Sequence, residues 1–152
     1  MHKTKLAFLL LGTIFCSACV SQQNKTENTI ITDLKTLTPE CRKVYLVGSG
    51  MTKALENMMS NNYILGTQLL CMSYRYYEME QTEINLLSEI SDDYFRNATR
   101  RISDSCLEVI EKDGDKAVLG FAKKADDTLK PYVKEHLDKC LLNMSLKSKE
   151  KI

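Results

Sequence analysis

The sequence predicts an all-α protein: a small up-down bundle of four to five helices with two disulfides, preceded by a signal peptide and a flexible tether. Its 152 residues include no Trp, six Gly and two Pro, and this composition favours helix over sheet. Apolar residues recur at the three-and-four spacing of a helix face, whereas no stretch of five or more residues alternates as a strand does. Four cysteines follow the N-terminal segment, one in each predicted helix.

Residues 1–18 have the composition of an export signal. A cationic start at 1–5 precedes an apolar run at 6–15 and small residues at the cleavage point. The run is about ten residues long, half of the roughly twenty that crossing a bilayer requires. Small residues directly before Cys19 resemble a bacterial lipobox, in which this cysteine becomes the lipid-bearing first residue. Because Cys16 stands where that pattern usually has Leu, ordinary secretory cleavage remains an alternative.

The mature chain is predicted to have three parts. Residues 19–37 are the anchor cysteine and a polar tether, residues 38–146 are the helical domain, and residues 147–152 are a basic tail. A flexible coil of about eighteen residues spans roughly 25 Å, which holds a folded domain just clear of a membrane surface. The domain is large enough to bury a core of its own.

The first predicted helix begins at Thr38 and ends at a Ser-Asn-Asn sequence. Thr38 is expected to cap the free amides, Pro39 suits the first helical position, and Glu40 complements the helix dipole. Gly48 and Gly50 weaken the middle of this helix, but their small size permits close contact with another helix.

Two helical segments come next along the chain. The second is expected over roughly residues 63–80. The third carries apolar residues at helical spacing over residues 82–109, either as one helix or with a fresh start capped near Ser91.

A turn is predicted at residues 112–115, and Asp115 is expected to cap the fourth helix after it. Pro131 is expected to kink or restart that helix, because proline lacks the amide that an interior position needs.

The four remaining cysteines predict two disulfides, because an even count in an exported chain indicates an oxidising compartment. Cys41 opens the first helix and Cys140 lies near the end of the last, so an antiparallel bundle places them at the same end. The second pair is then Cys71 with Cys106. These two meet only if the third segment starts afresh near Asp92, since otherwise their heights differ by roughly 20 Å.

Several classes of function are disfavoured. After removal of the signal, the chain has 19 basic and 20 acidic residues. Its net charge is then near zero, which argues against a nucleic-acid partner. Only His136 survives among the histidines, and no nucleophile elbow, phosphate loop, dinucleotide fingerprint or zinc-ligand pair is present. We therefore expect no enzyme, no catalytic residue, no metal and no cofactor, and the sequence identifies no small-molecule substrate.

A dense aromatic cluster predicts a partner-binding surface. Tyr74, Arg75, Tyr76 and Tyr77 are consecutive on the second helix, so at least one ring should be exposed. Exposed tyrosine beside arginine is typical of protein-binding hot spots. The alternative is structural, with Tyr74 and Tyr76 at the edge of the core and Tyr77 along the surface.

Arg96 and Arg100 form a basic turn that also belongs to the predicted partner-binding set. Their default explanation is local ion pairing, because Asp92 and Asp104 lie one helical turn away. The functional alternative is contact with an acidic partner or with anionic lipid headgroups.

These features favour a bacterial lipoprotein, anchored in the outer membrane, whose periplasm-facing helical domain binds another protein without catalysis. Small helical secretion pilotins and helical immunity proteins are similar at this coarse level, although no motif assigns the chain to either. Its predicted partners are the membrane, through the N-terminal lipid, and a protein.

The alternative is a soluble, secreted, disulfide-bonded helical carrier or signalling protein of eukaryotic origin. It rests on the cysteines, on Met-rich helices and on N-x-S/T triplets at Asn24, Asn97 and Asn143. Insect odorant-binding proteins resemble the chain in length and helicity, but their CxxxC spacing is absent. An apolar cavity inside the bundle would favour a carrier.

Overall fold

The computed structural model describes residue 30 and residues 33–150, with side chains as far as residue 140. The predicted signal peptide, Cys19, most of the tether and the last two residues lie outside the described residues. A compact unit begins at Leu34. The unit that begins there contains α2 (Pro39–Met59), α3 (Tyr63–Glu78), α4 (Gln81–Glu89), α5 (Asp92–Asp113), α6 (Asp115–Lys124), the π-helical η1 (Ala125–Leu129) and α7 (Lys130–Glu150).

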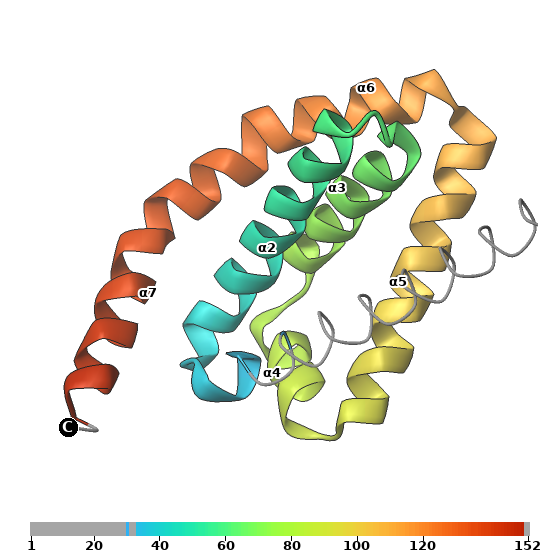
Figure 1. The fold of residues 1–152 in the computed structure, drawn as a ribbon. Coiled ribbons are helices and arrows are strands. Elements are labelled where there is room, and N and C mark those ends of the chain that lie inside the picture. The colour runs from blue at the N-terminus through green and yellow to red at the C-terminus, as the bar shows by residue number, and fades with distance from the viewer. Residues whose placement is uncertain (1–29, 31–32, 151–152) are drawn as a thin grey trace, which may run out of the picture. The chain divides into compact units, whose positions relative to one another are not determined.

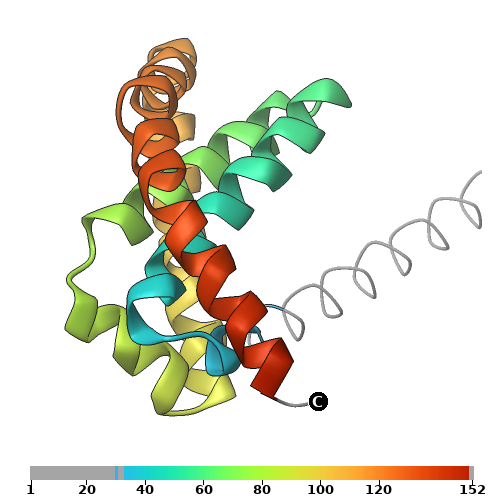
Figure 2. The same ribbon diagram turned by 90° about the vertical axis from the view of Figure 1, so that its left-hand side faces the viewer.

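The elements form the predicted all-α, up-down arrangement (Figure 1). α2 and α3 make an antiparallel hairpin, α5 runs back beside α3, and α6 crosses over before α7 descends along α2. The short α4 closes the opposite end. We call the end that holds α4 and the start of α2 the α4 end, and the end that holds the α2–α3 turn the hairpin end. Figure 2 shows the tip of the hairpin projecting away from the column of α6 and α7.

The start of α2 differs from the prediction in one detail. Pro39 is the first helical residue, but the Thr38 hydroxyl caps nothing, and its buried oxygen has no hydrogen-bond partner among the described residues. The Thr38 carbonyl instead accepts from the amides of Cys41, at 3.0 Å, and Arg42, at 3.2 Å. α2 ends as predicted, and Asn61 turns the chain with a φ of 62°.

The third predicted segment is two helices, so its fresh-start alternative is confirmed. α4 begins with a reciprocal capping box between Glu80 and Glu83. α5 begins after Ser91, whose hydroxyl accepts from the Tyr94 amide at 3.1 Å.

The turn before α6 is confirmed, with a different cap. Gly114 has φ 55° and ψ −128°, a conformation that L side chains rarely adopt, and it occupies the cap position of α6. Asp115 is the first residue inside the helix, so the prediction that it caps the helix is wrong. It complements the helix dipole instead.

As predicted, the helix is interrupted at Pro131, because α7 begins anew at Lys130 after a π-helical turn. The preceding turn widens into η1, where the Lys130 amide donates to the Ala125 carbonyl five residues back. Such a wide turn gives room for a residue that lacks an amide, so the helical path continues into α7.

The structure joins Cys41 to Cys140 and Cys71 to Cys106, the pairing that the helix order predicts, with Cα–Cα distances of 5.5 and 5.8 Å. All four residues are buried. The first disulfide fixes α7 to α2 at the α4 end, and the second fixes α3 to α5 within the bundle.

The packed unit begins earlier than the predicted boundary at residue 38. Residues 33–36 are helical, and Leu34 and Leu37 are only 1% and 7% exposed, although we assigned both to the tether. Arg42 Nε donates to the Leu34 carbonyl at 3.2 Å, which ties this turn to α2. The tether therefore ends before Leu34, because two leucines three residues apart give this stretch an apolar face.

Candidate protein-binding surfaces

A row of aromatic rings fills the junction of α3 and α7. Tyr74 and Tyr77 lie one turn apart on α3, with ring centroids 6.1 Å apart. Tyr77 meets Tyr132 of α7 edge-on at 5.1 Å, and Tyr132 meets His136 edge-on at 4.7 Å. All four side chains are half-buried. Edge-to-face contacts of this kind stabilise the junction by about 0.5–1.5 kcal/mol each beyond their burial.

Two lysines flank this aromatic row. Lys124 Nζ lies 4.2 Å from the centroid of the Tyr74 ring, and Lys43 Nζ lies 5.6 Å from that of Tyr77. The Lys43 ammonium also donates to the Met79 carbonyl at 2.6 Å, and its burial lowers the pKa of Lys43. Burial, together with the nearby Tyr77, raises the pKa of Tyr132. The row therefore combines half-buried aromatic rings with two lysine Nζ atoms that lie over the faces of Tyr74 and Tyr77.

The predicted tyrosine cluster divides between two sides of α3. Tyr76 is buried, and its hydroxyl lies 3.0 Å from Thr99 Oγ1 of α5. Tyr74 and Tyr77 face α6 and α7 instead. Arg75 is exposed and lies 3.8 Å from Glu78. Only Tyr74 and Tyr77 of the predicted binding residues on this helix are thus brought together.

Arg96 and Arg100 do not join the aromatic row, because they lie on α5, across α3 from it. Arg96 pairs with Asp93 at 3.6 Å and also interacts electrostatically with Asp92. Asp92 pairs with Lys35 at 2.6 Å, and this hydrogen bond lowers the pKa of the Asp92 carboxyl. Arg100 is exposed. Local ion pairing, the default explanation, accounts for Arg96.

The hairpin end exposes a cluster of large apolar side chains that sequence patterning missed. Leu55 and Met59 lie one turn apart at the end of α2, and Tyr63 and Ile64 begin α3. Their exposed fractions are 60%, 77%, 56% and 63%. The three-and-four spacing placed Leu55 and Met59 on the buried face of their helix. They are exposed because the hairpin projects from the bundle here and no other described helix covers them.

A second apolar cluster lies at the α4 end. Leu86 lies on α4, Ile90 is the C-cap residue of α4 one turn later, and Tyr94 lies in the first turn of α5. The exposed fractions of these three side chains are 46%, 55% and 37%. The pattern of a single third helix placed Ile90 and Tyr94 on the buried face. The break before α5 turns Ile90 and Tyr94 outward, whereas Leu87 of the same predicted face is buried and Phe95 is buried in place of Tyr94.

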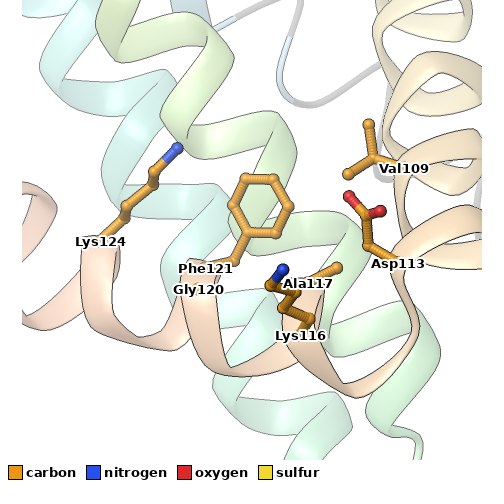
Figure 3. A pocket seen from close by; sticks show the side chains of 7 residues that line it. All are labelled: Val109, Asp113, Lys116, Ala117, Gly120, Phe121 and Lys124. Carbon is orange, nitrogen blue, oxygen red and sulfur yellow. The ribbon is translucent and has the colours of Figure 1, made fainter.

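A hollow of about 320 Å³ lies between α5 and α6 (Figure 3). It is lined by Val109, Asp113, Lys116, Ala117, Gly120, Phe121 and Lys124. Two lysines and an aspartate at its rim are exposed, so it is an open surface depression with a mixed polar and apolar lining. It is not the apolar internal cavity that a carrier requires.

The part of the chain that the structure describes offers neither a metal centre nor a membrane span. It contains no cluster of three or more His, Cys, Asp or Glu side chains able to hold a metal ion. Within the same residues, no helix combines the length and apolar character needed to cross a bilayer.

Comparisons of the chain with protein-family models, with curated protein sequences and with solved structures find no match. The function is therefore inferred from the aromatic row and the two exposed apolar clusters.

Proposed function

We propose that this protein is a lipid-anchored, non-catalytic helical module that faces the periplasm and binds another protein. The observation that carries the proposal is the hairpin-end cluster of Leu55, Met59, Tyr63 and Ile64, each more than half exposed. Large apolar side chains that are exposed near one another are typical of surfaces that bind proteins. The partner that suits such a surface is a protein with an apolar groove or helix, such as a secretion component or a toxin.

Two further observations support export and anchoring. Two buried disulfides suit an oxidising compartment, such as the periplasm. The signal-like start and the lipobox-like residues before Cys19 supply a route there and a lipid. Leu34, where the packed unit begins, is tied to α2 by the hydrogen bond from Arg42 Nε to its carbonyl, so the chain that follows Cys19 joins this unit beside the start of α2.

The anchor is tested with a Cys19→Ala variant and membrane fractionation. We expect the wild-type protein in the membrane fraction, with a diacyl mass on its first mature residue by mass spectrometry, and the variant in the soluble fraction. Unchanged membrane retention of the variant would reject the anchor.

The binding surface is tested with a Leu55→Glu/Met59→Glu double variant and crosslinking in cells. Burying two carboxylates in an apolar interface is strongly unfavourable, so we expect the crosslinked partner to be lost. The matched control is Leu119→Glu on α6, where an isolated leucine is 72% exposed. A partner lost equally in both variants, or kept in both, contradicts binding at the hairpin end.

The secreted alternative is favoured by a single observation, the exposed position of Asn97 on α5, where a sugar is sterically accessible. A sugar mass on Asn97 together with an unmodified mature N-terminus would replace the lipoprotein proposal.

A further inference from the structure

We infer that the α4 end rests in the headgroup region of a phospholipid bilayer through Leu86, Ile90 and Tyr94, the α4-end cluster. This orientation depends on the proposed lipid at Cys19 and extends that proposal. One end of the bundle lies on the membrane, and the hairpin end points away from it.

The composition and placement of the cluster suit a membrane interface. Two aliphatic side chains and a tyrosine lie at i, i+4 and i+8 across the junction of α4 and α5. The opposite faces of the same helices are anchored in the core by Ile84, at 1% exposed, and Phe95, at 3%. The cluster is thus held outward by a packed core. Tyrosine beside aliphatic residues is the mixture that membrane interfaces favour, because the ring is apolar and its hydroxyl stays hydrated.

The charges around the cluster are compatible with phosphate headgroups. Three carboxylates that adjoin the cluster each have a cationic partner, whereas Glu83, one turn before Leu86, is exposed and accepts from the Glu80 amide. Glu89 pairs with Arg42 at 3.0 Å, Asp92 with Lys35 at 2.6 Å and Asp93 with Arg96 at 3.6 Å. Because these carboxylates are paired, they do not give the cluster a net negative charge that the headgroups would repel.

The path of the chain brings the same end to the membrane. Lys35 comes directly after Leu34, and its ion pair with Asp92 places the start of the packed unit beside Ile90 and Tyr94. Cys19 precedes Leu34 by 15 residues, and the coil that the sequence predicts there would span roughly 20 Å. α2, with 21 residues, carries the hairpin end roughly 30 Å farther along the bundle. A lipid at Cys19 therefore brings the α4 end to the bilayer first.

The orientation is tested by tryptophan fluorescence, because the natural chain has no Trp. Tyr94→Trp and, as a second probe, Ile90→Trp report on the α4 end, and Tyr63→Trp is the matched control at the hairpin end. Each full-length lipidated protein is placed in vesicles of phosphatidylethanolamine and phosphatidylglycerol that contain brominated phosphatidylcholine. We expect several-fold stronger quenching and a blue-shifted emission for Tyr94→Trp and Ile90→Trp, and emission close to that in buffer for Tyr63→Trp.

Each outcome decides between the orientation and the anchor. If the chain carries lipid and floats with the vesicles, but the two α4-end probes are no more quenched than Tyr63→Trp, the orientation is wrong and the anchor stands. If only Tyr63→Trp is quenched, the proposed orientation is wrong and the hairpin end is the one that contacts the bilayer. If mass spectrometry finds no lipid on Cys19 and the chain does not float, the anchor fails and the orientation fails with it.

Discussion

Large apolar side chains are exposed at both ends of the bundle, but the two ends are held together differently. At the α4 end, ion pairs between Arg42 and Glu89 and between Lys35 and Asp92 join elements that are distant in sequence, and a disulfide is added to them. Polar and covalent links therefore fix the surroundings of the α4-end cluster. Such a surface keeps its shape whether or not anything covers it.

The hairpin end depends on the close approach of α2 and α3 instead. A Cβ atom added to Gly66 would lie 2.6 Å from Met58 Cγ and 3.1 Å from the Ala54 carbonyl oxygen. The hydroxyl of the buried Thr67 has no hydrogen-bond partner among the described residues. With fewer cross-links, this end should open more readily than the α4 end. An apolar binding surface that adapts to its partner gains from such freedom.

The largest expected effect comes from removing the disulfide at the α4 end. A Cys41→Ser/Cys140→Ser double variant frees a loop with a sequence separation of 99, which in the chain-entropy model lowers the free energy of unfolding by about 4–5 kcal/mol. Chemical denaturation of the variant and the wild type measures the loss. Hydrogen exchange should show α7 opening near the α4 end first. An unchanged unfolding midpoint would mean that the packing of α7 on α2 alone holds this end.

A smaller effect is expected from the α2–α3 contact. A Cβ atom at Gly50 would overlap Ser73 Oγ, whose hydrogen bond to the Val47 carbonyl, at 3.1 Å, is buried. Gly50→Ala should therefore lower the free energy of unfolding by about 1–3 kcal/mol, by displacing this hydroxyl or separating the helices. The matched control is Gly120→Ala, where nothing lies within 4 Å and a gain of about 0.5–1 kcal/mol is expected. Similar effects of the two substitutions in thermal unfolding would contradict close packing at Gly50.

The smallest effect is the pH dependence of the Lys35–Asp92 pair. The hydrogen bond from Lys35 holds the pKa of Asp92 below its usual value of 3.8. A carboxyl with a lowered pKa contributes stability that is complete above 3.8 and is lost as the pH falls through its folded pKa. An NMR titration should place the Asp92 midpoint below 3.8 in the wild type and move it upward in Lys35→Met. Identical midpoints in the two proteins would show that the pair does not form in solution.

Local chemistry made the helix boundaries and the disulfide pairing predictable. The cap at Ser91 and the turn at Gly114 are each determined by a few neighbouring residues. The pairing of Cys41 with Cys140 is a consequence of helix order alone, and the small size of Gly50 correctly predicted a close helix contact. Periodicity also identified the apolar stripes that contain Leu55 and Ile90.

The exposure of these stripes was not predictable, because spacing does not say which part of a helix another element covers. Leu55 and Ala54 are adjacent on α2, but only Ala54 is buried, because it lies on the face that packs against Gly66 of α3. Only the part of the aromatic row on α3 was predicted, for a similar reason. Tyr74 and Tyr77 are neighbours in sequence, whereas their contact with Tyr132 depends on how α7 packs against α3.

The bond between Cys41 and Cys140 also decides how the protein responds to mechanical pulling. A membrane anchor at the N-terminus and a load on residues beyond 140 would stretch the chain between them. The tension would run from residue 41 directly across to residue 140, and the chain between these residues, which includes both apolar ends, would bear almost none of it. Under such a load, the domain stays folded until the disulfide itself is reduced.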